Sequence, residues 1–69
     1  MKRRTMTRWK IDSGARIGGV AVLDDRIVDT ARCFWWLHHQ RFSEIRARWE
    51  PRGWTFTEME DSWVLERNC

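Results

Sequence analysis

Two short turn sequences divide residues 7–29 into three segments with strand-like patterns, and no other feature of the chain limits its fold as strongly. Asp24-Asp25 has the composition of a tight two-residue turn, and the Ser-Gly-Ala-Arg sequence at residues 13–16 suits a four-residue loop. Because such turns join neighbouring antiparallel strands, the three segments are expected to form a meander. The strands that these turns predict cover residues 7–12, 17–23 and 26–29.

The pairing register that the two turns impose provides an internal check. The tight turn sets Val22 opposite Ile27 and, further along, the same register sets Asp29 opposite Val20. The longer loop sets Trp9 opposite Val20. Directly opposed residues of antiparallel strands share one face of the sheet. That face therefore collects the large apolar residues Trp9, Ile11, Val20, Val22 and Ile27.

The middle of the chain no longer alternates between apolar and polar residues, and its spacing favours helix. Asp29 or Thr30 is the expected cap of a helical segment over residues 32–40. Ser43 is the expected cap of a second segment over residues 44–50. The pattern is compatible with two short helices and equally with one bent helix.

A return to alternation marks the end of the helical part. Pro51 disfavours helix before it, and Gly53 suits a left-handed exit. Residues 54–59 then read as a strand, and residues 62–66 as a final edge strand. The predicted fold class is α+β: a small antiparallel sheet, made of a three-stranded meander plus one or two C-terminal strands, with a helical segment across one face.

We expect a single domain over residues 1–69, with a flexible basic leader at residues 1–6 and an acidic tail or edge strand at residues 60–69. Met1 and Met6 are both possible translation starts. The chain has six Trp and three Phe, which is more aromatic surface than so small a core can enclose, so one or two rings should be exposed. Gly18 and Gly19 mark either a bulge or a gap left for a bulky ring.

The charges suggest where a partner would bind. Thirteen basic and ten acidic residues give a net charge of +3. The candidate partner-binding residues, which combine aromatic rings with positive charge, are Trp35, Trp36, His38, His39, Arg41, Arg46, Arg48 and Arg52. A candidate acidic patch consists of Glu58, Glu60, Asp61 and Glu66. The basic set fits an acidic protein groove or nucleic acid, and it is also compatible with a plain solvated helix face carrying a Glu44–Arg48 pair.

Catalytic and metal chemistry find little support in the sequence. His38 and His39 would point about 100° apart on a helix, a poor arrangement for one metal ion. Cys33 and His38 lack a third group to orient the imidazole, so we expect no catalytic residues, no metal and no cofactor.

The two cysteines and the absence of long apolar runs bear on location. No apolar run approaches the roughly 20 residues of a membrane span, and the basic N-terminus lacks the apolar stretch of a signal peptide. Two cysteines, Cys33 and Cys69, are too few for a disulfide-built mini-protein. We therefore expect two free thiols in a reducing cytoplasm.

Three stretches carry a resemblance to a group of known proteins: residues 17–31, Phe34-Trp35 and Arg52-Gly53-Trp54. This glycine-rich strand, the R-I-V-D-T-A hairpin exit, the aromatic helix start and the R-G-W strand entry resemble small phage and prophage proteins over roughly residues 7–57. That group often has Pro after D-T-A, where this chain has Arg32, which leaves the start of the helix open. Cys69 and the acidic tail lie outside the pattern.

The resemblance implies a viral origin and, by extension, a role against bacterial defence, for which anti-CRISPR proteins are the best-known group. We therefore expect a non-enzymatic, stoichiometric inhibitor of a bacterial CRISPR effector that blocks DNA recognition in the host bacterial cytoplasm. The alternatives are a small nucleic-acid-binding phage accessory protein and a virion or assembly component. The chain would act as a monomer or homodimer, and the sequence leaves the identity of the partner and the CRISPR type open.

Overall fold

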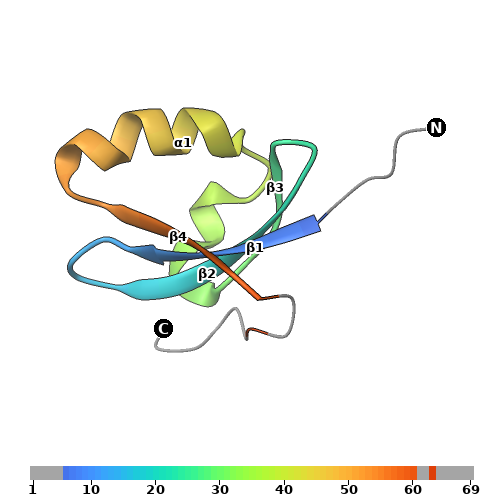
Figure 1. Cartoon of the computed structure of the whole chain (residues 1–69), viewed down its shortest axis with the longest axis horizontal. Coiled ribbons are helices and arrows are strands. Elements are labelled where there is room, and N and C mark those ends of the chain that lie inside the picture. Colours follow the sequence, from blue (N-terminus) through green and yellow to red (C-terminus); the bar gives the residue numbers. More distant parts are fainter. Residues whose placement is uncertain (1–5, 61–62, 64–69) are drawn as a thin grey trace.

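A computed structural model describes residues 6–60 and residue 63 of the 69-residue chain. Its elements are strands β1 (Met6–Asp12), β2 (Ile17–Leu23), β3 (Arg26–Thr30) and β4 (Thr55–Met59), helix α1 (Phe42–Trp49), and the 3-10 helices η1 (Arg32–Leu37) and η2 (Glu50–Arg52). The strands form one antiparallel sheet in the order β3-β2-β1-β4, and the helical segments lie over one face of it (Figure 1). The predicted α+β class is therefore confirmed. No helix in the described part of the chain is long and apolar enough to cross a membrane.

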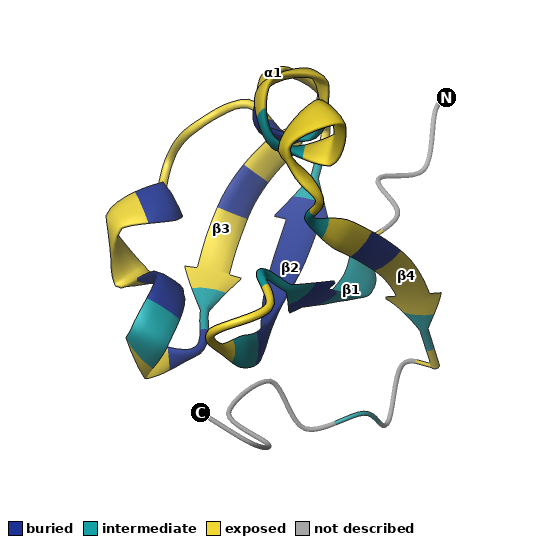
Figure 2. Ribbon diagram, turned by 90° about the vertical axis from the view of Figure 1, so that its left-hand side faces the viewer, coloured by how far each residue is buried: buried dark blue, intermediate teal, exposed yellow. Residues whose placement is uncertain are grey.

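The core lies between the sheet and the helical segments. The inward face of the sheet contributes Ile11, Val20, Val22, Ile27 and Phe56. The helical layer contributes Phe34, Leu37, Phe42 and Ile45, so the buried band runs between the two layers (Figure 2). The apolar face that the two turns predicted is confirmed, with Trp9 packed partly buried against it.

The register of the meander follows the turn chemistry near each turn. Asp24 and Asp25 both adopt left-handed backbone angles (φ 53° and 64°), as a two-residue hairpin turn requires, and Val22 pairs with Ile27 as expected. The expected pairing of Asp29 with Val20 is wrong. A β-bulge shifts the register, so that Asp29 pairs with Ala21.

Gly18 makes room for a ring, one of the two alternatives expected for it. A Cβ placed on Gly18 would lie 3.0 Å from Cδ2 of Phe34, 3.0 Å from Cβ of Ala31 and 2.8 Å from Sγ of Cys33. The contact with Cys33 is shorter than real Cβ contacts and the other two are tighter than most, so a larger residue here would force η1 away from β2.

The helical part forms two separate segments, which is one of the two alternatives expected. The first segment differs from the expectation because it is a short 3-10 helix that ends at Leu37 instead of reaching residue 40. Ala31 precedes it without a side-chain cap, so neither Asp29 nor Thr30 caps η1. The helix ends because the residues after it form backbone hydrogen bonds with β3 instead. The Ile27 N–H donates to the Gln40 carbonyl at 3.0 Å, and the Ile27 carbonyl accepts the His39 N–H at 2.8 Å.

Helix α1 begins two residues earlier than predicted. Its N-cap position is Arg41, and Ser43 lies inside the first turn rather than at the cap. The exit agrees with the prediction, since Gly53 adopts a left-handed conformation at φ 101°. In β4, Phe56 is buried between exposed Thr55 and Thr57, as the alternation predicted. The edge strand expected over residues 62–66 lies outside the described residues apart from Trp63, where the backbone is not in a strand.

Candidate partner-binding surface

Three indoles pack against one another at the surface between η1, α1 and β4. Trp49 and Trp54 stack with ring centroids 4.6 Å apart and an interplanar angle of 18°. Trp36 meets this pair edge-on, 6.1 Å from Trp49 and 6.0 Å from Trp54. Offset and edge-to-face contacts are the preferred geometries of aromatic pairs, so the Trp36 ring is held in place rather than left loose.

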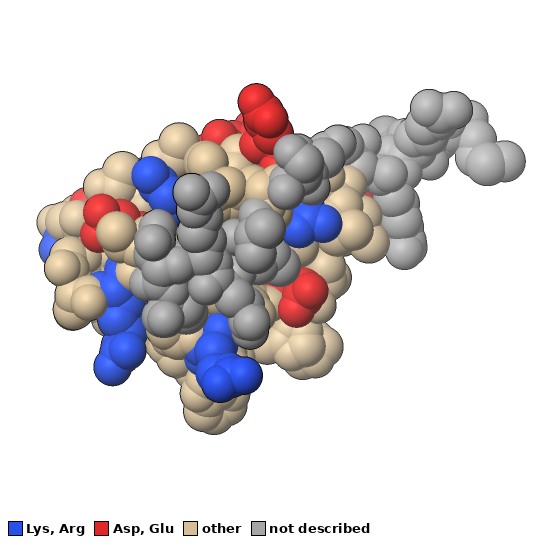
Figure 3. All heavy atoms as spheres, turned by 90° about the horizontal axis from the view of Figure 1, so that it is seen from below, with Lys and Arg blue, Asp and Glu red and all other residues tan. Residues whose placement is uncertain are grey.

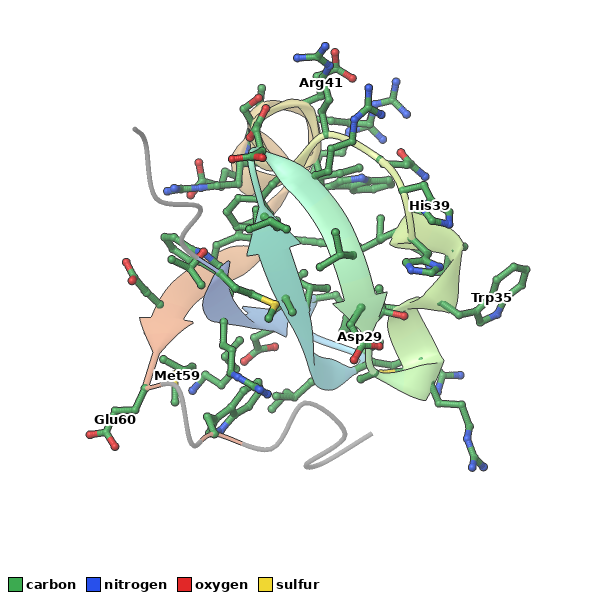
Figure 4. The ribbon with its side chains drawn as sticks, turned by 90° about the vertical axis from the view of Figure 1, so that its right-hand side faces the viewer. Asp29, Trp35, His39, Arg41, Met59 and Glu60 are labelled. Carbon is green, nitrogen blue, oxygen red and sulfur yellow. The ribbon has the colours of Figure 1, made fainter. Side chains whose placement is uncertain are left out.

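The outermost rings belong to η1. Trp35 has 71% of its surface exposed and Trp36 has 42%, and Figure 4 shows Trp35 projecting away from the molecule. The other four indoles are partly buried, since Trp9, Trp49, Trp54 and Trp63 are all of intermediate exposure. The expectation that one or two aromatic rings would be exposed is confirmed.

The burial pattern of η1 explains why two adjacent indoles face outward. The segment bends at Phe34, whose backbone is not helical (φ −120°, ψ 21°), so η1 is not one regular helix. Phe34 and Leu37 both point into the core, where they are almost completely buried. Trp35 and Trp36 occupy the two intervening positions and are turned outward.

Arg52 extends this cluster, because its guanidinium carbon lies 5.4 Å from the ring centroid of Trp49. We call Trp35, Trp36, Trp49, Trp54 and Arg52 the indole surface. Trp49 and Trp54 were not among the sequence candidates. Their share in the surface depends on tertiary contacts between α1, β4 and η1, which local spacing does not reveal.

Arg46 lies over a different set of rings from the indole surface. Its guanidinium carbon is 5.2 Å from the Trp9 ring centroid and 5.9 Å from that of Phe56, and its Nη2 pairs with Glu50 at 3.0 Å. The ion pair on α1 is therefore Arg46–Glu50 rather than the expected Glu44–Arg48. Arg41 and Arg48 are exposed, Arg41 just before α1 and Arg48 in its last turn. Of the candidate arginines, Arg52 therefore contacts the indole surface through Trp49, whereas Arg46 contacts rings of β1 and β4.

His38 and His39 lie in the turn after η1 rather than on a helix, so the expected divergence of their rings is wrong. The rings stack with centroids 3.9 Å apart, and Nε2 of His38 is 2.9 Å from the Val28 carbonyl oxygen. His39 has a left-handed backbone at φ 72°. No group of three or more potential metal ligands occurs among the described residues.

The acidic candidates are only partly described. Glu58 and Glu60 are exposed on and just after β4, whereas Asp61 and Glu66 lie outside the described residues. Basic and acidic side chains are interspersed on the described part of the face in Figure 3. That face offers no extended field of one sign.

Cys33 corrects the expectation of free thiols. It is bonded in a disulfide, and no cysteine in the described part of the chain is free. The chain's second cysteine, Cys69, lies outside the described residues. Disulfides are rare in reducing compartments, so the cysteines no longer support a cytoplasmic setting.

Comparison with known proteins gives no relative: no family model, curated protein or solved structure matches this chain.

Proposed function

We propose that this chain is a non-enzymatic binding module that attaches stoichiometrically to a macromolecular partner through the indole surface. The observation that carries this proposal is the packing of Trp36, which is 42% exposed yet held edge-on by two stacked indoles. A ring that is already ordered loses little conformational entropy when a partner covers it. Trp and Arg are also the residues most enriched at interface hot spots.

The shape of this surface suits a protein partner better than a small-molecule substrate. Trp35 and Trp36 are exposed on η1, and Arg52 holds its guanidinium over Trp49, which Trp36 meets edge-on. Such a projecting aromatic group suits insertion into a pocket on another protein, with Arg52 available for a carboxylate at the rim.

The more specific proposal follows from the resemblance to small phage and prophage proteins. The chain would inhibit a bacterial CRISPR effector by occupying a surface that the effector needs for DNA recognition. The small size and the projecting indoles support this proposal. The host cytoplasm is the setting that it requires, because the effector works there, although the Cys33 disulfide is unusual for a reducing compartment.

A plaque assay tests both levels of the proposal. Cells that carry one active CRISPR system and express this chain should lose protection against a targeted phage. Trp35→Ala should abolish this effect, while Val28→Ala, a change at an exposed apolar residue of β3, should retain it. Full CRISPR protection with the wild-type chain for every type tested would reject the specific inhibitor role.

Nucleic acid is the second candidate partner, favoured by the cation–π contact of Arg52 with Trp49 next to exposed indoles. Single-stranded nucleic acid binds to aromatic platforms flanked by positive charge, and this binding weakens steeply with salt. A mobility-shift assay with a single-stranded oligonucleotide at low salt distinguishes the two candidates. No shift for the wild-type chain would reject nucleic acid, and a salt-sensitive shift lost in Trp35→Ala would favour it over a protein.

A further inference from the structure

Strand β4 forms one edge of the sheet (Figure 2), and its register shows which backbone groups point away from β1. The Ser13 N–H donates to the Arg16 carbonyl at 3.0 Å, which sets the alternation of hydrogen-bonded pairs along β1 and β2. By this alternation, the even-numbered residues of β1 direct their N–H and C=O groups toward β4. They pair there with Thr55, Thr57 and Met59.

It follows that Phe56 and Glu58 direct their N–H and C=O groups in the plane of the sheet, away from β1. The other even-numbered residues next to them, Trp54 and Glu60, agree with this assignment because their backbone groups also bond away from β1. The Trp54 N–H donates to the Trp49 carbonyl at 3.1 Å, and the Glu60 carbonyl accepts the Trp63 N–H at 3.0 Å. Between these two bonds, the two N–H and two C=O groups of Phe56 and Glu58 have no partner among the described residues.

The opposite edge of the sheet is covered. Ile27 of β3 exchanges two backbone hydrogen bonds with the segment after η1, and Arg26 forms a bridge with Arg41. Nε2 of His38 also lies within hydrogen-bonding distance of the Val28 carbonyl oxygen, at 2.9 Å. Among the described residues, therefore, the backbone of β4 is open to pairing with an extended chain and this part of β3 is not.

We propose that β4 pairs antiparallel with β4 of a second copy of this chain, about a two-fold axis at Thr57, so that the two sheets become one. In this register the Phe56 N–H and C=O bond the Glu58 C=O and N–H of the second copy, and the reverse pair forms by symmetry. All outward groups between the two occupied positions are then satisfied. Thr57 of one copy then faces Thr57 of the other across the axis, and Thr55 faces Met59 of the second copy.

The neighbouring registers are less favourable. A two-fold axis at Glu58 would set two carboxylates directly opposite each other, which is destabilising. An axis at Phe56 would align Glu58 with Trp54 of the second copy, whose N–H is already bonded to Trp49. The Thr57 register avoids both conflicts.

Charge complementarity also favours a second copy as the occupant. Glu58 lies on the helix-covered face, because it is directly opposite Trp9 in the sheet. In the dimer it would come opposite Phe56 of the second copy, whose ring lies 5.9 Å from the guanidinium carbon of Arg46. Each end of the interface would therefore bring the Glu58 carboxylate of one chain near Arg46 of the other, in addition to the Glu50 carboxylate that Arg46 already pairs with.

Sedimentation velocity over a range of concentrations tests the dimer, with a non-reducing denaturing gel to exclude covalent linkage. The wild-type chain should shift from monomer to dimer as its concentration rises. Thr57→Lys sets two ammonium groups opposite each other at the axis and should weaken self-association at least about tenfold. Val28→Lys, at an exposed position of β3 on the opposite edge of the sheet, is the control and should dimerise as the wild type does.

Three outcomes would overturn the proposal: a wild-type chain that stays monomeric up to millimolar concentration, a Thr57→Lys variant that still dimerises, or equal loss in both lysine variants. Amide hydrogen exchange gives a readout that needs no substitution. The Phe56 and Glu58 amides should become protected only as concentration rises, whereas the Thr57 amide, which bonds β1, should be protected throughout. Concentration-independent exchange at Phe56 and Glu58 would exclude β4 as the interface.

Discussion

Asp25 caps helix α1 through Ser43: its Oδ1 accepts the Ser43 backbone N–H at 2.9 Å, and its Oδ2 accepts the Ser43 hydroxyl at 2.7 Å. The Asp25 carbonyl also accepts the Phe42 N–H at 2.8 Å. These bonds satisfy donors that the first turn of any helix leaves unpaired. A residue of the β-hairpin turn therefore fixes where the helix begins.

Replacement of Asp25 should destabilise the fold by loss of this cap. We expect Asp25→Ala to lower the free energy of unfolding by about 1–2 kcal/mol, in the range of other lost caps. Ser43→Ala removes only the hydroxyl bond and should cost less, about 1 kcal/mol. Asp25→Asn is the control for the turn, because Asn tolerates the left-handed backbone. Urea denaturation measures all three, and an unchanged midpoint for Asp25→Ala would contradict the capping role.

The same contacts predict an acid sensitivity of the fold. The hydrogen bond from the Ser43 side chain lowers the pKa of Asp25 below its ordinary value of 3.8, with further lowering from the Ser43 N–H and from Arg41 and Arg26. A lowered pKa in the folded state means that the unfolded state binds more protons in this range. The stabilisation is therefore complete above pH 3.8 and is lost as the pH falls through the folded-state pKa. Between pH 5 and about pH 2, unfolding curves of Asp25→Asn should show a shallower loss of stability than the wild type.

The strands were predictable because their signals are local. The Asp24-Asp25 turn and the loop at residues 13–16 determine the neighbouring pairs, and these pairs agree with the structure. The β-bulge changes the partner of Asp29 from Val20 to Ala21, and neither turn sequence predicts this bulge. The helix limits were missed because they depend on distant groups: Ile27 takes the backbone after η1, and Asp25 replaces the expected Ser43 cap.

Gly18 should resist substitution, since a methyl group there has no free space. We expect Gly18→Ala to lower the free energy of unfolding by about 1–3 kcal/mol, the usual cost of overpacking a core. The added Cβ would have to displace Phe34, Ala31 or Cys33, and thus part of η1. Thermal unfolding followed by circular dichroism measures the effect. A melting temperature equal to that of the wild type would show that η1 moves away without cost.

The disulfide at Cys33 gives a chemical prediction. Iodoacetamide should leave Cys33 unmodified in the denatured but unreduced protein, because a disulfide sulfur is not a nucleophile. After reduction with a phosphine, the same residue should be fully alkylated. Peptide mass spectrometry reads both states. Alkylation of Cys33 before reduction would show a free thiol and restore the compatibility with a reducing compartment.

The candidate binding surface was only partly predictable from the sequence. The number of aromatic residues relative to the chain length indicated that some would be exposed, and Trp35 and Trp36 are. Which residues support them was not predictable, because Trp49 and Trp54 reach Trp36 from other elements. Arg46 was placed with the candidates by its position on a basic helix face, but its guanidinium packs over the rings of β1, β4 and α1 instead.

Stability measurements separate the indoles that support the fold from those that are free to bind. Trp54 stacks on Trp49 at 4.6 Å and contacts Phe34 at 5.7 Å, so Trp54→Ala should lower the free energy of unfolding by at least about 2 kcal/mol. Trp35 is 71% exposed, so Trp35→Ala should change it by less than about 0.5 kcal/mol. Chemical denaturation followed by far-ultraviolet circular dichroism compares the two without relying on indole fluorescence. A large loss in Trp35→Ala would mean that this ring stabilises the fold itself, and the reason to assign it to a partner would disappear.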